Sequence, residues 1–272
     1  MVDKTLAFIG GGNMAGSIIG GLLNRGFEPA QLRVSDIVEA NRDRFSEMGL
    51  FASDDSSLVI QGADAVILAV KPQQLKDVCE SIAPALQQNR PLLISIAAGV
   101  EVAAIQQWVG YDAAVVRCMP NTPALVLTGA SGLYAAPGVS DEQRELATAA
   151  LEAVGIVVWV DSEEKLHAVT AVSGSGPAYM FLMMEAMVTA GHSLGLSPET
   201  ARELTAQTAL GAARMVQGND EDIAELRRRV TSPGGTTERA IRVFEERGLR
   251  RIFEDAMEAC DKRSRELGEE LR

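Results

Sequence analysis

The sequence predicts an α/β protein in which a doubly wound parallel sheet is followed by an all-helical domain. Short apolar runs alternate with helical patterns up to about residue 160, and strand signals then stop. A glycine-rich turn directly after the first apolar run adds a third observation. We therefore expect a nucleotide-binding type of domain over residues 1–162 and an all-helical domain over residues 163–272.

The first expected strand, residues 6–9, leads into a glycine-rich turn that opens a helix. In the pattern G-x-G-x-x-G/A, Gly10 permits the turn, Gly12 lets a pyrophosphate approach the backbone, and Ala15 keeps the helix close to the strand. The N–H groups at the start of a helix lack partners and favour an anion. The turn therefore predicts a dinucleotide site in a Rossmann-type domain.

A helix and a second strand follow the turn. Ile18, Ile19, Leu22 and Leu23 recur at helical spacing, and Gly26 is the expected stop. The second strand, residues 32–34, ends at Ser35 and Asp36. An acidic residue about 20 positions beyond the glycines is where a ribose contact is expected.

Four more strands are expected at residues 65–70, 92–96, 114–118 and 156–160. The first two lack a two-residue alternation, which is typical of central strands with both faces covered by helices. Because ligands bind at the carboxyl ends of such strands, the candidate loops are residues 71–72, 97–99 and 119–123.

Helical patterns begin at Glu163, Pro177, Pro198, Ile223, Thr236 and Leu249, and Ser197 is the expected cap before Pro198. The apolar stretch 178–194 is shorter than the ~20 residues of a membrane span, and Glu185 and His192 interrupt it. We expect a buried helix there. The Ala, Met and Leu content of this half is typical either of packing within one chain or of a face buried against another subunit.

Two segments of the helical half, residues 173–179 and 231–237, combine glycines and hydroxyls where new helices start. Free N–H groups and neutral donors together predict a receptor for a small carboxylate, most strongly at residues 232–237. The candidate loops contain no His, Asp or Glu. Hydride transfer to a protonated C=N, which needs mainly positioning, therefore fits better than reduction of a ketone.

The composition narrows the possible partners and compartment. A formal charge of −12 argues against nucleic acid, which requires a basic face. Cys79, Cys118 and Cys260 lack the spacing of a zinc or redox site, so we expect reduced, structural thiols and no metal. The N-terminus shows no secretory signal pattern and no membrane span is expected, which makes the cytoplasm the expected location.

Five motifs occur in one order along essentially the whole chain: residues 10–15, 70–72, 119–123, 173–179 and 231–237. In these motifs the chain resembles pyrroline-5-carboxylate reductase. The resemblance implies that NAD(P)H reduces L-Δ1-pyrroline-5-carboxylate to L-proline, the last step of proline biosynthesis. It also implies that the helical half interleaves with a second copy in homodimers, which can assemble into decamers.

The resemblance implies cofactor contacts at Gly10, Gly11, Gly12, Asn13, Met14, Ser35, Asp36, Val70, Lys71, Pro72 and Ala97. It implies substrate contacts at Ser232, Gly234, Gly235, Thr236 and Thr237 and, by a weaker match, at Glu163. Thr237 is implied as the catalytic residue, because its hydroxyl would hydrogen-bond the ring nitrogen.

Residue 36 leaves the choice between NADPH and NADH open. The resemblance favours NADPH, whereas the Asp36 carboxylate suits the ribose hydroxyls of NADH and repels a 2′-phosphate. Asp36 could instead turn outward while Ser35 and Arg42 or Arg44 meet the phosphate.

Two other functions are compatible with parts of the sequence. A β-hydroxyacid dehydrogenase would need a catalytic lysine, for which Lys165 is the nearest candidate, but residues 232–237 would be unexplained. A non-catalytic dinucleotide sensor would need only the first glycine motif, so the second loop argues against it.

Overall fold

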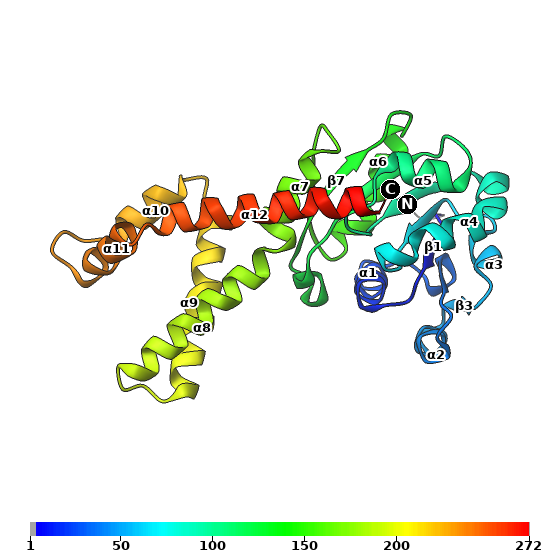
Figure 1. Cartoon of the computed structure of the whole chain (residues 1–272). Coiled ribbons are helices and arrows are strands. Elements are labelled where there is room, and N and C mark those ends of the chain that lie inside the picture. The colour runs from blue at the N-terminus through cyan, green and yellow to red at the C-terminus, as the bar shows by residue number, and fades with distance from the viewer. Residues whose placement is uncertain (1–3, 272) are drawn as a thin grey trace. The chain divides into compact units, whose positions relative to one another are not determined.

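The computed structural model describes residues 4–271, which form two compact units. Unit 1 comprises the described residues up to Ser175 together with those from Cys260 onwards, and unit 2 is Gly176–Ala259. Figure 1 shows the chain coloured from its N-terminus to its C-terminus. The last strand ends at Trp159, so the change to helices comes where the sequence predicts it, although the first turns of that helical part belong to unit 1.

Within residues 4–271, unit 1 contains one eight-stranded sheet in the order β3-β2-β1-β4-β5-β6-β7-β8. Neighbouring strands pair in parallel except β6 and β7, which are antiparallel. The strands are β1 (Leu6–Ile9), β2 (Leu32–Ser35), β3 (Phe51–Ser53), β4 (Ala65–Leu68), β5 (Leu92–Ser95), β6 (Val115–Met119), β7 (Gly129–Ala135) and β8 (Gly155–Trp159).

The six expected strands are confirmed to within two residues, and β4 and β5 lie at the centre of the sheet as predicted. Two strands were not predicted. β3 has three residues at the sheet edge and carries too short a pattern to detect. β7 contains Gly132, where a Cβ would lie 2.5 Å from Cγ1 of Val169, so close packing requires a glycine that weakens the strand signal.

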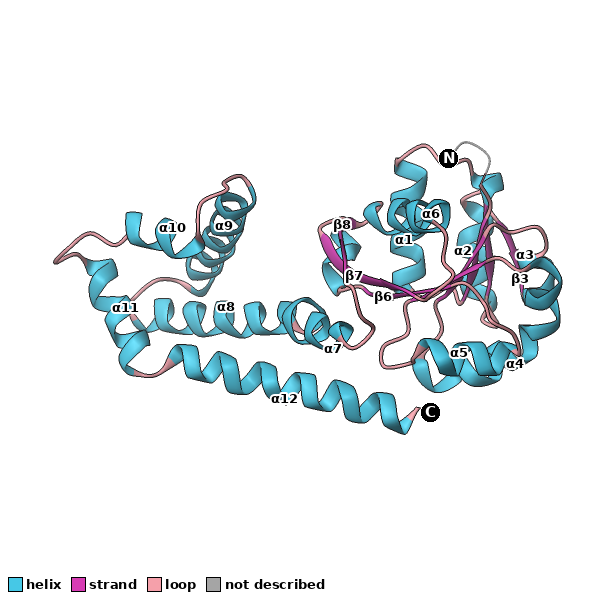
Figure 2. Ribbon diagram, turned by 90° about the horizontal axis from the view of Figure 1, so that it is seen from above, coloured by secondary structure: helices cyan, strands magenta, loops and turns pink. Residues whose placement is uncertain are grey.

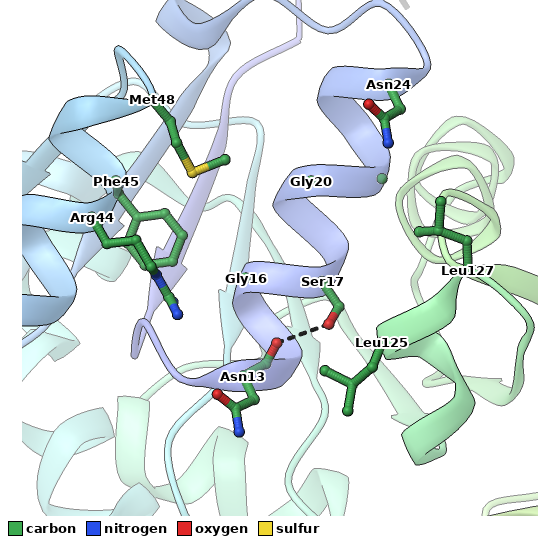
Figure 3. A pocket seen from close by; sticks show the side chains of 11 residues that line it. Asn13, Gly16, Ser17, Gly20, Asn24, Arg44, Phe45, Met48, Leu125 and Leu127 are labelled. Carbon is green, nitrogen blue, oxygen red and sulfur yellow. Dashed lines mark hydrogen bonds between the residues drawn. The ribbon is translucent and has the colours of Figure 1, made fainter.

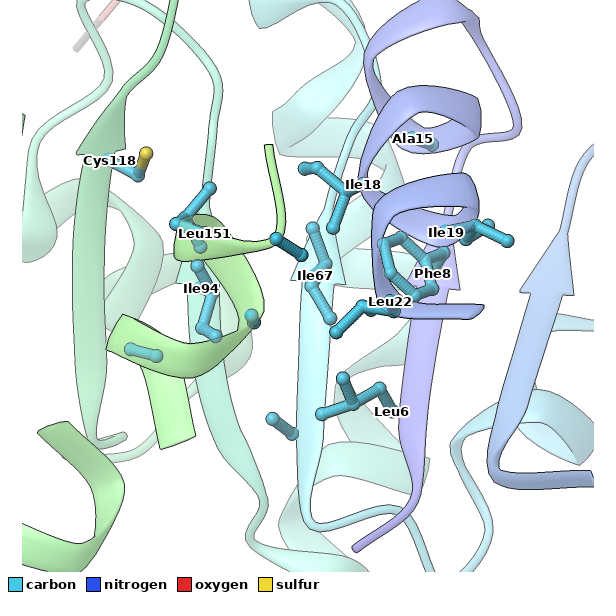
Figure 4. Packing of buried hydrophobic residues seen from close by; sticks show 14 of the residues in the cluster. Leu6, Phe8, Ala15, Ile18, Ile19, Leu22, Ile67, Ile94, Cys118 and Leu151 are labelled. Atoms are coloured by element: carbon cyan, nitrogen blue, oxygen red, sulfur yellow. The ribbon is translucent and has the colours of Figure 1, made fainter. Parts of the chain in front are cut away.

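Helices cover both faces of the sheet (Figure 2). On one face, Ile18 and Leu151 pack with Phe8 of β1, and Figure 4 shows this layer. On the other face, Leu75 and Ile105 pack in a second apolar cluster. The α-helices of this part are α1 (Asn13–Asn24), α2 (Glu39–Glu47), α3 (Ser56–Ile60), α4 (Pro72–Asn89), α5 (Val102–Val109), α6 (Asp141–Glu152) and α7 (Lys165–Val169). Pro29–Gln31 and Thr122–Val126 are 3₁₀ helices, and Thr170–Gly174 is a π-helical turn.

Unit 2 is built from helices, and the last of them is shared between the units. Its helices are α8 (Gly176–Ser193), α9 (Pro198–Gln217), α10 (Ile223–Arg229), α11 (Thr236–Glu246) and the first part of α12 (Leu249–Glu270). Ser197 Oγ accepts a hydrogen bond from the backbone N–H of Thr200, which confirms the predicted cap.

The expectation of a buried helix over residues 178–194 is wrong for the single chain. None of the residues of α8 is buried, and Phe181 is 64% exposed. The helix is apolar on several sides, and the other helices of unit 2 leave much of it uncovered. This exposure favours the second alternative, a face buried against another subunit. Among the described residues, none of the helices has the length and hydropathy to cross a membrane.

Candidate active site

The residues expected to bind the cofactor lie at the carboxyl ends of four neighbouring strands, β2, β1, β4 and β5. Backbone hydrogen bonds join these ends: Gly10 N–H donates to Ser35 O over 2.8 Å, and Ala69 N–H donates to Ile9 O over 2.8 Å. The chain passes from β1 to β2 on one side and later returns as β4 on the other, which makes this edge a topological switch point. The structure therefore gathers the expected cofactor residues at one place.

The glycine turn before α1 packs closely against its neighbours and leaves the start of the helix uncovered. Gly10 has φ +101°, and a Cβ there would lie 2.7 Å from Ala69 O. A Cβ on Gly11 would lie 2.8 Å from Cε2 of Phe45, whereas one on Gly12 would meet nothing within 4 Å. No side chain caps α1 at Gly12. The N-terminus of α1 is thus open to an anion, and these residues fit a dinucleotide.

The Asp36 carboxylate is turned back toward the glycine turn. Its Oδ2 accepts hydrogen bonds from Gly11 N–H at 2.7 Å and from Asn41 Nδ2 at 3.1 Å. Its Oδ1 accepts a third from Val38 N–H at 2.8 Å. Asp36 therefore fixes the glycine turn itself, a role that the sequence did not indicate, and Asn41 is a partner that sequence reasoning missed.

Two guanidinium groups flank the same turn. Arg42 donates to Asp36 O over 2.9 Å, and Arg44 donates to Gly11 O over 2.8 Å. The Arg44 guanidinium lies 4.4 Å from the centre of the Phe45 ring. Figure 3 shows both side chains beside α1. Ser35 itself is buried, and its hydroxyl is 2.8 Å from that of Ser56. The end of β2 therefore has positive charge available, although Ser35 does not present an exposed hydroxyl.

A pocket of about 430 Å³ lies along α1, bordered by α2 and by the segment that contains Leu125 and Leu127 (Figure 3). Among the expected cofactor residues only Asn13 lines it. The pocket therefore adjoins the glycine turn but does not coincide with the expected cofactor site.

Glu163 belongs to a partly buried ion pair. Its Oε1 accepts hydrogen bonds from Val102 N–H, at the start of α5, and from Arg117 of β6, both at 2.7 Å. The Arg117 side chain is only 6% exposed, so the carboxylate compensates a charge that is costly to bury alone. The pair ties β6 to the helix that follows residues 97–99. Arg117 was missed, although an arginine inside an apolar strand pattern is a usable signal.

His167 of α7 contacts the last turns of α12. Its side chain is largely buried, and Nδ1 lies 2.8 Å from Ser264 Oγ. Burial lowers the pKa of His167 below its ordinary 6.5, and the nearby Arg265 and Arg117 lower it further, while Asp261 and Glu164 oppose them. These surroundings therefore favour the neutral form of the imidazole.

Acidification is expected to destabilise the packing of α12 on α7. The pKa of His167 is lower in the folded chain than in the unfolded one, so the unfolded state binds more protons as the solution is acidified. The contribution of His167 to the free energy of unfolding is therefore fully present above pH 6.5 and is lost as the pH falls below it. Replacing His167 with Gln should reduce the fall in Tm between about pH 8 and about pH 5. Thermal unfolding at several pH values measures this, with His192→Gln as the control; an unchanged slope in the His167 variant would contradict the assignment.

The 232–237 loop joins α10 to α11 in unit 2. Gly234 has φ +72° and donates its N–H to Glu238 Oε2 over 2.8 Å, while Gly235 N–H donates to Ser232 O over 3.0 Å. No side chain caps α11 at Gly235, so the N–H groups of its first turn, where Thr236 and Thr237 lie, remain available to a ligand. The loop therefore offers the first-turn N–H groups of α11 to an anion, whereas the N–H groups of Gly234 and Gly235 already have partners within the chain.

The other glycine-hydroxyl segment is used differently. A new helix starts there as predicted: the π-helical turn ends at Gly174, and α8 begins at Gly176 after a bend at Ser175. Ser173 Oγ donates to Val169 O, and Ser173 O accepts from Asn121 Nδ2 at 3.0 Å. A Cβ on Gly174 would lie 2.5 Å from Cε of Met119. This segment therefore holds the 119–123 loop in place, and the structure gives no support for a separate carboxylate receptor there.

The remaining candidate side chains have ordinary structural environments. Burial raises the pKa of both Cys79 and Cys118 to about 12, which keeps the thiols protonated and unreactive. The Lys165 ammonium lies 2.8 Å from the Asp161 carboxylate on the surface. Over residues 4–271, no group of three or more His, Cys, Asp or Glu side chains could hold a metal ion.

Comparisons with known proteins agree with this geometry. Residues 163–267 match the family model described as pyrroline-5-carboxylate reductase dimerisation, and residues 5–99 match the model described as NADP oxidoreductase coenzyme F420-dependent. The chain is 52% identical to pyrroline-5-carboxylate reductase of Pseudomonas aeruginosa over 272 residues, which cover 100% of this chain and 99% of that protein. It is 44% identical to the Haemophilus influenzae enzyme of the same name over 98% of each chain.

Solved structures show the same similarity. A pyrroline-5-carboxylate reductase from Coxiella burnetii superposes with a TM-score of 0.94 at 45% identity and covers 97% of this chain and 98% of that one. The Plasmodium falciparum pyrroline carboxylate reductase with NADP bound gives a TM-score of 0.86 at 28% identity, over 98% of this chain and 99% of that one.

Proposed function

The chain belongs to the pyrroline-5-carboxylate reductase family, and on that premise we propose how its residues reduce the C=N bond of L-Δ1-pyrroline-5-carboxylate to give L-proline, the last step of proline biosynthesis. The protein is a NAD(P)H-dependent oxidoreductase. One observation carries the assignment of residues: the chain combines an open glycine turn before α1 with an uncapped, hydroxyl-rich N-terminus of α11.

We assign the cofactor to the carboxyl edge of the sheet. The N–H groups at the start of α1, with Gly10–Gly12 before them, would hold the pyrophosphate, and Asn13 and Met14 begin that helix. The loops after β4 and β5 would flank the rest of the cofactor, through Val70, Lys71, Pro72 and Ala97. When bound, the reduced nicotinamide supplies the hydride.

We assign the substrate to the 232–237 loop. Ser232, Gly234, Gly235 and Thr236 would bind its carboxylate at the positive end of α11. For the two glycines this requires that Gly234 N–H leave Glu238 Oε2 and that Gly235 N–H leave Ser232 O when the substrate binds. The Thr237 hydroxyl would hydrogen-bond the ring nitrogen, which orients the C=N bond and stabilises the nitrogen as it becomes an amine. We include Glu163 among the substrate residues because it matches a position of the family. Its contacts with Arg117 and Val102 give it a second role, which is to hold α5.

The protein forms oligomers through its dimerisation domain. We propose that the sheet-bearing residues 1–162 bind the nucleotide, that residues 163–272 bind substrate and form the homodimer, and that the active site includes helices of both subunits. We further propose that five dimers assemble into a decamer and that the protein is cytoplasmic. The exposed apolar side chains of α8, among them Phe181, supply the surface for the dimer.

Of the two nicotinamide cofactors, we propose NADPH as the preferred one. The Asp36 carboxylate already accepts three hydrogen bonds from the protein. Arg42 and Arg44 place two positive charges at the end of β2, where a 2′-phosphate would lie. The outward turn considered for Asp36 does not occur, because its carboxylate bonds the glycine turn, and Ser35 is buried. The arginines of that arrangement remain, and we propose that Arg42 and Arg44 meet the phosphate.

Replacing Asp36 with Asn is expected to raise the ratio of kcat/KM for NADPH to that for NADH. Removing one carboxylate charge near the phosphate relieves about 1 kcal/mol of repulsion in water, or roughly fivefold. Asn keeps one oxygen that can accept the Gly11 N–H bond, whereas Asp36→Ala removes all three bonds and should weaken both cofactors. Parallel steady-state kinetics with the two cofactors measure the ratio, and an unchanged ratio in Asp36→Asn would show that this charge does not face the phosphate.

The reaction is tested by following oxidation of NADPH and of NADH with pyrroline-5-carboxylate as substrate and identifying the product. Formation of proline in proportion to cofactor oxidised supports the proposal. Cofactor binding without turnover by an assembled protein would favour the sensor, and turnover of hydroxyacids alone would favour the dehydrogenase.

A further inference from the structure

The last turns of α12 return to unit 1 and pack on the loop that follows β5. Gly268 is buried, and a Cβ there would lie 3.1 Å from Gly99 O. Gly99 has φ +81°, and a Cβ on it would lie 3.4 Å from Cδ1 of Leu271. Leu271 also packs against the apolar cluster that contains Ala97 and Val100. The backbone of residues 97–100 is therefore in close contact with the end of the chain.

Polar contacts one and two turns earlier fix this end of α12. Ser264 Oγ lies 2.8 Å from Nδ1 of His167. Arg265 donates to Glu164 over 2.7 Å and to Asp261 over 2.8 Å, which links α12 to the segment that precedes α7. A shift of the helix along residues 97–100 would break these contacts.

We propose that Gly268 and Leu271 are positioning residues for the nicotinamide end of the cofactor. The inference rests on the proposed function, in which the loop that contains Ala97 flanks the cofactor beyond its pyrophosphate, and it assigns the nicotinamide ring to that loop. Gly268 lets α12 approach the Gly99 carbonyl, and Leu271 covers the outer side of the same glycine. Together they hold the 97–99 backbone in the conformation that the ring contacts, while the glycine turn that binds the pyrophosphate does not depend on them.

Helix α12 also connects the 97–99 loop, along the chain, with the proposed substrate loop. α12 begins at Leu249, just after α11, whose first turn carries Thr237. The same helix therefore runs from unit 2, to which we assign the substrate residues, into unit 1, where its last turn contacts the 97–99 loop. A displacement of Gly268 should consequently affect hydride transfer more than it affects binding of the adenine end.

The test compares the binding of NADPH with that of a ligand that has no nicotinamide ring. Gly268→Val adds branched carbon atoms against Gly99 O, and we expect the Kd for NADPH to rise about tenfold, with a lower kcat. The Kd for 2′-phospho-ADP-ribose, which lacks the ring, should stay unchanged. Gly268→Ala should give a smaller change in the same direction. Glu269→Ala, an exposed side chain on the same turn, is the matched control and should leave both Kd values unchanged.

Leu271→Ala is a second variant, and it leaves Gly268 and its helix packing unchanged. It should also raise the ratio of the Kd for NADPH to the Kd for 2′-phospho-ADP-ribose. An unchanged ratio in both Leu271→Ala and a folded Gly268→Val would overturn the proposal. Equal weakening of both ligands would also overturn it, because that result indicates a general loss of structure. The ratio of the two Kd values is measured without turnover. Failure of this inference is therefore distinguishable from failure of the proposed function, in which the wild-type chain would not reduce pyrroline-5-carboxylate.

Discussion

Replacing Thr237 with alanine is expected to lower kcat by about ten- to a hundredfold without changing the Kd of the cofactor. The hydroxyl is proposed to bond the ring nitrogen of a protonated C=N, and a hydrogen bond to a charged group contributes about 1.5–3 kcal/mol. Thr237 lies in the first turn of α11 within unit 2, whereas the glycine turn lies in unit 1. The loss should therefore appear in the chemical step.

Thr237→Ser is the matched control, because it restores the hydroxyl without the methyl group and should recover most of the wild-type kcat. Thr237→Val keeps the shape and removes the hydroxyl, so it should behave like alanine. Steady-state kinetics with varied substrate, combined with titration of NADPH, separate kcat from binding. A wild-type kcat in both Thr237→Ala and Thr237→Val would remove the hydroxyl from the mechanism.

The main features of the fold are predictable because they follow from local patterns. The runs at β4 and β5 are continuous and apolar, and their four residues each are buried as the pattern predicts. β7 shows the limit of this reasoning. Gly132 is required there because a Cβ would collide with Val169, a residue far along the chain. The sequence around the strand therefore carries no sign of the contact.

The candidate site is predictable to a smaller extent. The glycine turn could be placed because its backbone requirement is local, as the φ of +101° at Gly10 illustrates. The direction of the Asp36 carboxylate depends on N–H groups from two other segments, which a sequence pattern does not encode. Gly268 carried a weak signal, because a glycine inside a helical pattern costs stability and suggests close packing.

The exposed apolar face of α8 leads to the prediction with the largest effect. Phe181→Asp places a carboxylate where the dimer is expected to bury an aromatic ring, and an unpaired charge in such an interface is strongly unfavourable. We expect monomers, and a loss of activity of at least about a hundredfold, equivalent to about 2.7 kcal/mol of lost transition-state stabilisation. The loss follows from the proposal that helices of both subunits build the active site.

Light scattering of the purified variant, run beside the activity assay, measures both effects on the same sample. Leu58→Asp is the matched control, because Leu58 is 50% exposed on α3 of unit 1, outside the region that matches the dimerisation model, and should leave dimer and activity unchanged. Binding of 2′-phospho-ADP-ribose should survive in Phe181→Asp, since the glycine turn and its contacts lie within unit 1. Retained ligand binding with lost turnover would locate the defect in the shared substrate site rather than in folding, whereas an active monomer would show that one chain carries the complete site.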